Sequence, residues 1–103
     1  MGKGPETLFQ EQVLKYLKET IGGYWIKIHV SSFTSRGVPD VIGSYKGRFI
    51  AFELKRPDGK GTVSKLQEYN IKLINEAGGY ACVIQSMEQL KELFEDDKIL
   101  RLQ

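Results

Sequence analysis

The stretch Arg36–Lys55, which reads RGVPDVIGSYKGRFIAFELK, limits the possible folds of this chain more than any other segment. Two apolar-rich runs, Val38–Tyr45 and Arg48–Lys55, flank the turn-forming pair Lys46–Gly47, a pattern typical of a β-hairpin. The glycine suits a positive φ at the second loop position, although lysine does not favour one at the first. The sequence therefore predicts two antiparallel strands joined by a two-residue turn.

The register of this hairpin places two acidic residues face to face. With the Lys-Gly pair in the loop, Asp40 lies directly opposite Glu53, and facing Cβ atoms are roughly 4.5–5.5 Å apart. Like charges at that separation destabilise a sheet, so the pair calls for a cation. Lys55 shares the face of Glu53 because side chains alternate along a strand. A slip of one residue would separate the carboxylates, whereas a slip of two would leave them diagonal but within reach of one metal.

The composition is that of one small soluble domain. With 103 residues, 41% of them hydrophobic and 27% charged, the chain can form a single core and is not expected to be disordered. The single cysteine, Cys82, excludes an intramolecular disulfide or a zinc cluster and fits a reducing compartment. No apolar stretch approaches membrane-spanning length and the N-terminus lacks a signal-peptide core, so we expect a cytoplasmic protein without a membrane partner.

The first part of the chain predicts a helix followed by a strand. Pro5 suits a helix start and Gly22–Gly23 a helix end. Between them apolar residues recur at steps of three and four: Phe9, Val13, Tyr16, Leu17 and Ile21. Tyr24–Ser31 then alternates, as a half-buried strand does, before a polar loop at Ser31–Arg36. One face of this strand holds Tyr24, Ile26, Ile28 and Val30, and the other holds Trp25, Lys27, His29 and Ser31.

Two capping boxes, Ser64-x-x-Gln67 and Ser86-x-x-Gln89, open the helices of the second half. We expect the first of these helices to turn five apolar residues inward: Leu66, Tyr69, Leu73, Ile74 and Ala77. Tyr80–Gln85 favours a buried strand, and the last helix carries Leu90, Leu93 and Phe94. The predicted order is therefore αβββαβα, an α/β sandwich in which helices flank a short mixed β-sheet. A single domain over residues 1–103, without linker or repeat, is expected.

Several short motifs together resemble one nuclease family. Pro39-Asp40 followed by Glu53-Leu54-Lys55 is similar to the signature of the PD-(D/E)xK nuclease superfamily. The longer strings GVPD and FELK resemble the VRR-NUC (virus-type replication-repair nuclease) domain in its small stand-alone phage form. That resemblance also includes Ser64, Gln67 and Glu6. It covers nearly the whole chain, and the ordered set is far more specific than Glu-x-Lys alone.

The resemblance implies a restriction-endonuclease-like fold and a metal-dependent DNA endonuclease, with Mg²⁺ or Mn²⁺ and no organic cofactor. In this family the aspartate and glutamate hold the metal, the lysine assists the attacking water and the glutamine supports the site. The matching positions here are Asp40, Glu53, Lys55 and Gln67, with Glu6 of the first helix as a further candidate. Stand-alone members are associated with cutting branched DNA as homodimers. We therefore expect a Holliday-junction resolvase-like enzyme of DNA repair, in the host cytoplasm if it is phage-encoded.

The chemistry of the residues agrees with this resemblance. Phosphodiester hydrolysis needs an activated water and a neutralised transition state, and both suit a divalent cation. Mg²⁺ prefers oxygen ligands and keeps several waters, so Asp40, Glu53 and the backbone carbonyl of Leu54 suffice as protein ligands. Lys55 is expected to orient the water or to stabilise charge developing on the phosphate, and not to bind the metal.

Each of these residues also has a structural interpretation. Asp40 would then only end a loop, and Glu53 with Lys55 would form a charged stripe that protects an edge strand from aggregation. Gln67 would only complete its capping box, and Glu6 would only complement the helix dipole. The sequence leaves both possibilities open for Gln67 and Glu6.

A DNA surface on this chain has to come from local clusters, because the net charge is only +2. Basic residues gather before the carboxylates, at the hairpin tip and after the catalytic lysine: Arg36, Lys46, Arg48, Arg56, Lys60 and Lys65. Such side chains contact phosphates without reading sequence, and no segment is typical of a recognition helix. We expect branched or duplex DNA to be recognised by its shape.

Two other functions remain open on the sequence. One is a non-cleaving DNA-binding or replication-partner module, which would have no use for facing carboxylates that repel phosphate. The other is a restriction-like or end-resecting nuclease on the same fold. If the resolvase interpretation holds, one constellation in 103 residues requires a C₂ dimer to cut two strands. Candidate interfaces are the outer face of the first helix and the C-terminal tail, with Ile99, Leu100 and Leu102.

Overall fold

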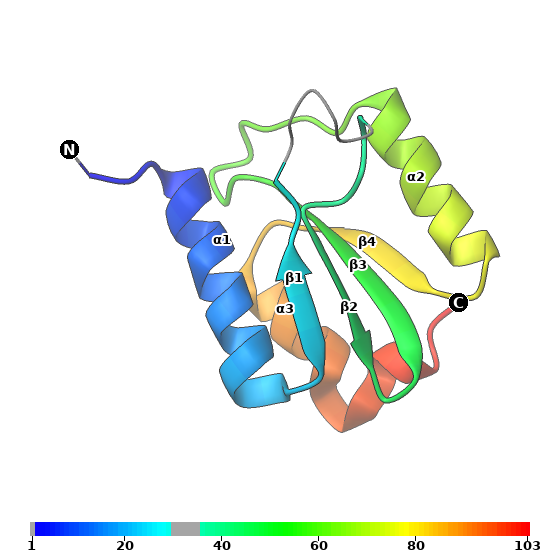
Figure 1. Ribbon diagram of the computed structural model, residues 1–103. Coiled ribbons are helices and arrows are strands. Elements are labelled where there is room, and N and C mark those ends of the chain that lie inside the picture. Colours follow the sequence, from blue (N-terminus) through cyan, green and yellow to red (C-terminus); the bar gives the residue numbers. More distant parts are fainter. Residues whose placement is uncertain (1, 30–35) are drawn as a thin grey trace.

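The computed structural model describes residues 2–29 and 36–103. The end of the predicted first strand and most of the polar loop, residues 30–35, therefore lie outside the described residues. The chain forms a four-stranded sheet with helices on both sides (Figure 1). Its main elements are α1 Pro5–Tyr16, β1 Tyr24–Lys27, β2 Val41–Tyr45, β3 Arg48–Leu54, α2 Lys65–Glu76, β4 Tyr80–Ile84 and α3 Met87–Phe94. A π-helical turn, Leu17–Ile21, extends α1, and a 3₁₀ segment, Glu95–Leu100, follows α3. The predicted order αβββαβα is confirmed.

The sheet has the strand order β1-β2-β3-β4 and is mixed, as predicted. β1, β2 and β3 are antiparallel, whereas β4 runs parallel to β3. The pairing of β2 with β3 ends at Tyr45 opposite Arg48, which confirms the predicted register. Lys46 and Gly47 have φ values of 46° and 86°, so the lysine does adopt the left-handed conformation that it disfavours. In this conformation the Lys46 side chain forms a largely exposed ion pair with Asp97 at 2.6 Å.

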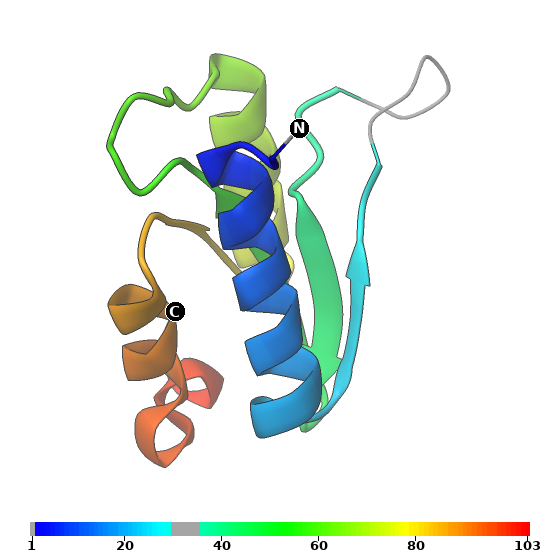
Figure 2. The same ribbon diagram turned by 90° about the vertical axis from the view of Figure 1, so that its left-hand side faces the viewer.

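The core lies on the face of the sheet that α1 and α3 cover (Figure 2). Trp25 is only 3% exposed there, and its ring stacks on Phe52 at a centroid distance of 6.1 Å. Gly43 makes room for the indole, because a Cβ at this position would lie 2.4 Å from Trp25 Cε3. The buried face of β1 is therefore that of Trp25, whereas Tyr24 and Ile26 are exposed.

The prediction that α2 turns its apolar residues inward is wrong for Leu66, Tyr69 and Leu73, whereas Ile74 is half-buried against Gly79. Within residues 65–76 none is fully buried, and Leu66, Tyr69 and Leu73 are all more than 40% exposed. Polar contacts help to hold the helix over β3 and β4. The Asn75 amide, for example, donates to the carbonyl of Ala81 at 3.0 Å and accepts from its N–H at 2.9 Å. The apolar periodicity of α2 marks a surface that this chain leaves uncovered.

The C-terminal tail also differs from its predicted role. Ile99 was a candidate for a dimer interface, yet it is fully buried in the core with Leu90 and Phe94. The 3₁₀ segment turns it inward after two residues with positive φ, Asp96 and Asp97. In the described ranges, every helix is too short or too polar to cross a membrane.

Candidate active site

Asp40 and Glu53 come together where the β2–β3 pairing ends. Asp40 directly precedes β2, and its Oδ2 accepts a hydrogen bond from the Leu54 N–H at 2.8 Å. Its backbone carbonyl accepts from the Ile28 N–H at 2.7 Å, which ties this corner to the end of β1. Because Val41 pairs with Phe52, the next position along puts the two carboxylates opposite one another, as the sequence predicted.

Glu53 is a buried carboxylate whose hydrogen bonding is incomplete. It is 3% exposed, and its Oε1 accepts from the Gln67 Nε2 at 2.9 Å. Its Oε2 is buried without a hydrogen-bond partner among the described residues. Burial, together with the neighbouring Asp40, raises the pKa of Glu53 to about 8, while the positive charges of Lys55 and Lys27 act in the opposite direction. The site thus holds a buried carboxyl oxygen without a hydrogen-bond donor in the described part of the chain.

Lys55 lies on the same face as Glu53, as strand alternation predicted. Its Nζ is 3.9 Å from Glu53 Oε1 and donates a hydrogen bond to Gln67 Oε1 at 3.3 Å. The side chain is only 14% exposed, so the ammonium group is held in place and not free in solvent. Gly61 passes over its stem, where a Cβ would lie 3.3 Å from Lys55 Cδ.

Gln67 makes the contacts of its capping box and also contacts Glu53 and Lys55. Its backbone N–H donates to Ser64 Oγ at 3.1 Å, and its Oε1 accepts from the Ser64 N–H at 2.9 Å, which completes the capping box of α2. The same amide group contacts Lys55 and Glu53 through its two polar atoms. The start of α2 is thereby fixed to the carboxylate site.

The structure does not bring Glu6 into this network. Glu6 is exposed in the first turn of α1, and α1 packs on the opposite side of the sheet from α2. Lys27, which the sequence analysis did not single out, is close enough for its charge to lower the pKa of Glu53 slightly, although it lies on the face of β1 that carries Trp25. The signal was its place in β1, because Lys27 pairs with Val41 and so lies one step from Asp40.

The predicted DNA-binding residues fall into two groups. Arg36, Lys60 and Lys65 are exposed near the carboxylate end of the sheet, and Arg56 is half-buried there with a buried Nε that has no hydrogen-bond partner within residues 2–29 and 36–103. Lys46 and Arg48 lie at the other end of the hairpin. The Arg48 guanidinium donates to the backbone carbonyls of Gly78, Gly79 and Ile99, so its donors are already used inside the protein.

The donor set at Asp40 and Glu53 fits a hard divalent cation. Two carboxylates with an unpaired buried oxygen supply the oxygen ligands that Mg²⁺ and Mn²⁺ prefer. In the part of the chain that the structure describes, no group of three or more His, Cys, Asp or Glu side chains gathers into a metal site. A metal here would therefore need backbone or water ligands besides the two carboxylates. The backbone carbonyl of Leu54 was predicted to be such a ligand. Leu54 lies beside Asp40, because its N–H donates a hydrogen bond to the Asp40 carboxylate.

A comparison with solved structures finds a protein of the same architecture. A structure described as a VRR_NUC domain protein superposes on the chain with a TM-score of 0.73 and 17% sequence identity. The match covers 93% of this chain and 89% of that chain. The likeness confirms the fold that the sequence motifs predicted, that of a VRR-NUC nuclease domain. No protein-family model matches the sequence, and no curated protein matches it.

Proposed function

We propose that this chain is a divalent-metal-dependent endodeoxyribonuclease that cuts branched DNA, in the manner of a Holliday-junction resolvase. The observation that carries the proposal is the buried Glu53 carboxylate, which faces Asp40 and keeps one oxygen without a hydrogen-bond partner in the described chain. Burial and the facing Asp40 raise the pKa of Glu53 to about 8, so without a cation the site opposes ionisation of this carboxyl, and a bound cation would reverse that effect. Nuclease-fold architecture and the neighbouring lysine point to phosphodiester hydrolysis as the use of such a cation.

The roles of the residues follow from their positions. Asp40 and Glu53 would hold Mg²⁺ or Mn²⁺, which supplies Lewis-acid activation of a water and charge stabilisation at the phosphate. Lys55 is kept beside Glu53 by Gln67, so its ammonium group is positioned to orient the water or to bind the phosphate. Gln67 is a positioning residue, because it holds both the carboxylate and the lysine.

Recognition of DNA in this proposal rests on the basic residues at the carboxylate end. Arg36, Arg56, Lys60 and Lys65 belong to the segments that border Asp40 and Lys55 and are suited to phosphate contacts. Lys46 and Arg48 are left out, because the hairpin tip uses them internally. Such contacts select backbone shape, which suits a branched substrate, and cutting two strands of a junction calls for a two-fold pair of chains.

The test is cleavage of a labelled four-way junction with Mg²⁺ or Mn²⁺, beside linear duplex and single-stranded DNA of the same sequence. We expect paired cuts in the junction and much weaker cutting of the linear substrates. Asp40→Asn should be inactive, whereas Asp96→Asn, an exposed aspartate far from the site, should cut normally. Equal cutting of all three substrates would leave a nuclease without junction selectivity, and metal binding without cleavage would leave a DNA-binding module.

A further inference from the structure

The face of the sheet that carries Asp40 and Glu53 also carries a row of aromatic side chains. Ser44 of β2 pairs with Tyr24 of β1 on one side and with Phe49 of β3 on the other. Because side chains alternate along a strand, Ser44 lies on the same face as Asp40, four residues further along the chain. At about 3.4 Å per residue, the aromatic row is therefore about 14 Å from the facing carboxylates.

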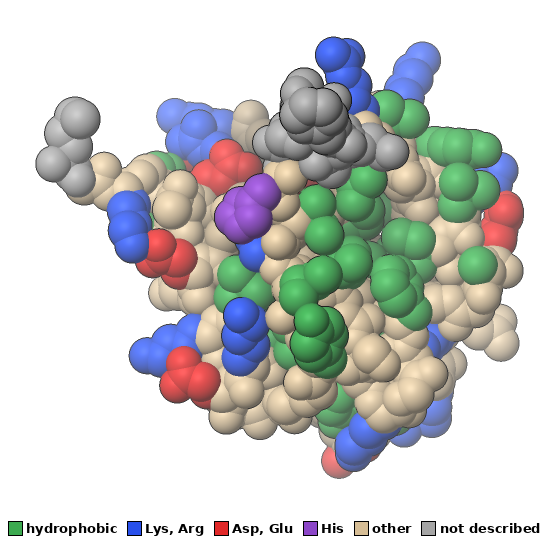
Figure 3. Space-filling view, in the orientation of Figure 1, with side chains coloured by type: hydrophobic (Ala, Val, Ile, Leu, Met, Phe, Trp, Pro, Cys, Tyr) green, Lys and Arg blue, Asp and Glu red, His purple; other side chains and the backbone are tan. Residues whose placement is uncertain are grey.

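This row borders a hollow of about 210 Å³, which α2 leaves open because the helix covers only β3 and β4 on this face. We call the hollow the aromatic slot. Tyr24 is 68% exposed and Phe49 46%, so both rings are accessible to a ligand. Figure 3 shows the hydrophobic side chains together over the strands, with charged side chains mainly around the margin. The slot is lined by six uncharged residues: Tyr24, Ile26, Ile42, Gly43, Ser44 and Phe49.

The width of the aromatic slot suits one flat ring. Its two aromatic walls stand on β1 and β3, which are separated by one strand, so their backbones are roughly 9.5 Å apart. A flat ring in van der Waals contact with both walls needs roughly 3.5 Å on each side. An α-helix with its side chains is about 10 Å or more across and cannot enter between the walls. The shape therefore favours a flat aromatic ligand over a helical protein partner.

The Phe49 wall is supported on the side away from Ser44. Gly79, in the turn between α2 and β4, lies so close that a Cβ there would be 3.2 Å from Phe49 Cδ1 and 3.0 Å from the Phe49 carbonyl oxygen. The opposite wall, Tyr24, stands on the edge strand β1, and its mostly exposed ring can change rotamer. One supported wall and one adjustable wall suit flat rings of different size.

We propose that the aromatic slot binds an unpaired nucleobase of the DNA substrate. Bases have flat, uncharged faces that stack on aromatic side chains, whereas phosphates need cations, which the slot does not supply. Ser44 adds a hydroxyl group that can hydrogen-bond the edge of a base. The position fits as well, because about 14 Å corresponds to about four nucleotide steps along a stacked strand. A base that leaves the stack near a branch point can reach the slot while its strand lies at Asp40 and Glu53.

Base stacking in the slot has a consequence for substrate choice. Every base has a flat face, so stacking on Tyr24 and Phe49 tolerates any base but requires one that is unpaired. DNA with unpaired nucleotides close to the scissile phosphate would therefore bind more tightly than fully paired DNA. The choice of DNA as the ligand rests on the proposed function, whereas the slot itself follows from strand pairing, exposure and charge.

The test compares the binding of two four-way junctions in EDTA, where metal-dependent cleavage does not start. One junction carries unpaired thymidines at its branch point, and the other carries abasic residues at the same positions. The two DNAs have equal charge and differ only in the bases. Wild type should bind the thymidine junction roughly 5- to 100-fold more tightly, which is the range expected for one stacked base.

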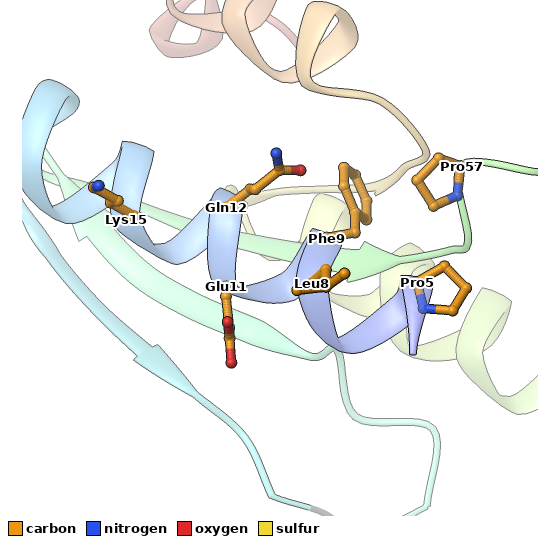
Figure 4. A pocket seen from close by; sticks show the side chains of 7 residues that line it. All are labelled: Pro5, Leu8, Phe9, Glu11, Gln12, Lys15 and Pro57. Carbon is orange, nitrogen blue, oxygen red and sulfur yellow. The ribbon is translucent and has the colours of Figure 1, made fainter. Parts of the chain in front are cut away.

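Substitutions of Tyr24 separate stacking from general apolar contact. Tyr24→Leu keeps an apolar side chain but removes the ring, so the preference for the thymidine junction should fall to about twofold or less. Tyr24→Phe should retain the preference. Leu8→Ala is the matched control, because Leu8 is 50% exposed and lines a separate groove with Pro5, Phe9 and Pro57 on the α1 side (Figure 4). This variant should bind both junctions as wild type does.

Footprinting of wild type keeps the test decisive if a variant unfolds. Hydroxyl-radical oxidation of Tyr24 should fall when the thymidine junction is bound and should change little with the abasic junction. Equal affinity for the two junctions, or a preference that survives Tyr24→Leu, would overturn the slot. Protection of Tyr24 that grows with protein concentration in the absence of DNA would assign this surface to a protein partner and would overturn it too.

The slot and the proposed function can fail separately. A preference for the thymidine junction in EDTA without any cleavage in Mn²⁺ would count against the proposed function alone. Cleavage of both junctions by a wild type that binds them equally would count against the slot alone.

Discussion

The two ends of the β2–β3 hairpin carry charged side chains that the fold treats in opposite ways. At the turn, Lys46 pairs with Asp97 at 2.6 Å, and Arg48 donates to three backbone carbonyls. At the open end, Asp40 faces Glu53, and one carboxylate oxygen stays buried without a hydrogen bond in the described chain. The same two strands thus hold one end where a cation and a carboxylate pair directly and one end where two carboxyl groups face each other beside Lys55.

The pKa values record this difference. Hydrogen bonds from Lys46 and Tyr45 hold the pKa of Asp97 below its usual range, so ionisation of this carboxyl is favoured. Burial and the adjacent Asp40 shift the pKa of Glu53 upward to about 8, so its ionisation is opposed. The turn end thus favours ionisation of its carboxyl, whereas the open end opposes it, and under our proposal a bound cation would reverse the effect at the open end.

The largest effect should come from the open end. Asp40→Asn or Glu53→Gln should lower the rate of junction cleavage by at least about 10²-fold, because each removes an anionic oxygen from the metal-binding pair. Binding of the uncut junction should be unchanged or tighter, since a negative charge near phosphate is lost. Single-turnover cleavage measures the rate, and a binding titration measures the affinity for the uncut junction. An Asp40→Asn variant that still cuts would show that Asp40 has no part in catalysis.

Lys55→Ala should also lose cleavage, by roughly 10²-fold or more, with little change in Mn²⁺ affinity. The reason is that Lys55 contacts Gln67 and Glu53 on the side where water and phosphate would lie. Cleavage assays combined with calorimetry separate the two quantities, with Lys60→Ala as the exposed basic control. A large loss of Mn²⁺ binding would instead mean that Lys55 organises the carboxylates.

The turn end should show the opposite pattern. Arg48→Ala removes hydrogen bonds to the carbonyls of Gly78, Gly79 and Ile99, and should lower the free energy of unfolding by about 1–3 kcal/mol. The cleavage rate per folded molecule should stay the same. Denaturant unfolding measures the stability, and cleavage under folding conditions measures the rate. Loss of cleavage with unchanged stability would instead indicate that Arg48 contacts DNA, as the sequence predicted.

The smallest effect on the cleavage rate is expected at Gln67, where a substitution should lower both stability and the rate. Gln67→Ala should cost about 1 kcal/mol of stability through the lost cap and also slow cleavage about tenfold through Glu53 and Lys55. Gln89→Ala is the matched control, because the Gln89 amide bonds only the Val83 carbonyl and the Gln85 N–H at the end of β4 and contacts neither Glu53 nor Lys55. It should lose stability only. Equal rates in both variants would reduce Gln67 to a helix cap.

The sequence predicted the parts of the fold that local rules control. Strand alternation and the two-residue turn predicted the register that brings Asp40 and Glu53 together. The capping box predicted the start of α2 at Lys65. Local rules do not say which faces become covered, however. Trp25 is buried because Gly43 leaves room for it across the sheet. The apolar stripe of α2 is exposed because the helix turns Gln67, Ile74 and Asn75 toward the sheet.

The sequence likewise predicted some contacts of the candidate site and not others. The facing carboxylates and Lys55 follow from alternation within a single hairpin, so the sequence contains them directly. The double role of Gln67 depends on where α2 crosses the sheet, and the place of Ile99 depends on two positive φ angles after α3. Such contacts between distant segments are set by tertiary packing, which periodicity does not encode.

The central claim, that the open end is a cation site, is tested most directly by thermal melting with and without metal. In EDTA, wild type should lose stability as pH rises from about 4.5 to about 8, because the folded Glu53 keeps a proton that the unfolded chain releases. Asp40→Asn should melt higher than wild type at the upper end of this range, because the facing charge is gone. Mn²⁺ should raise the Tm of wild type but not of Asp40→Asn. An Asp40→Asn variant that melts lower in EDTA, or a wild-type Tm that Mn²⁺ leaves unchanged, would contradict the account.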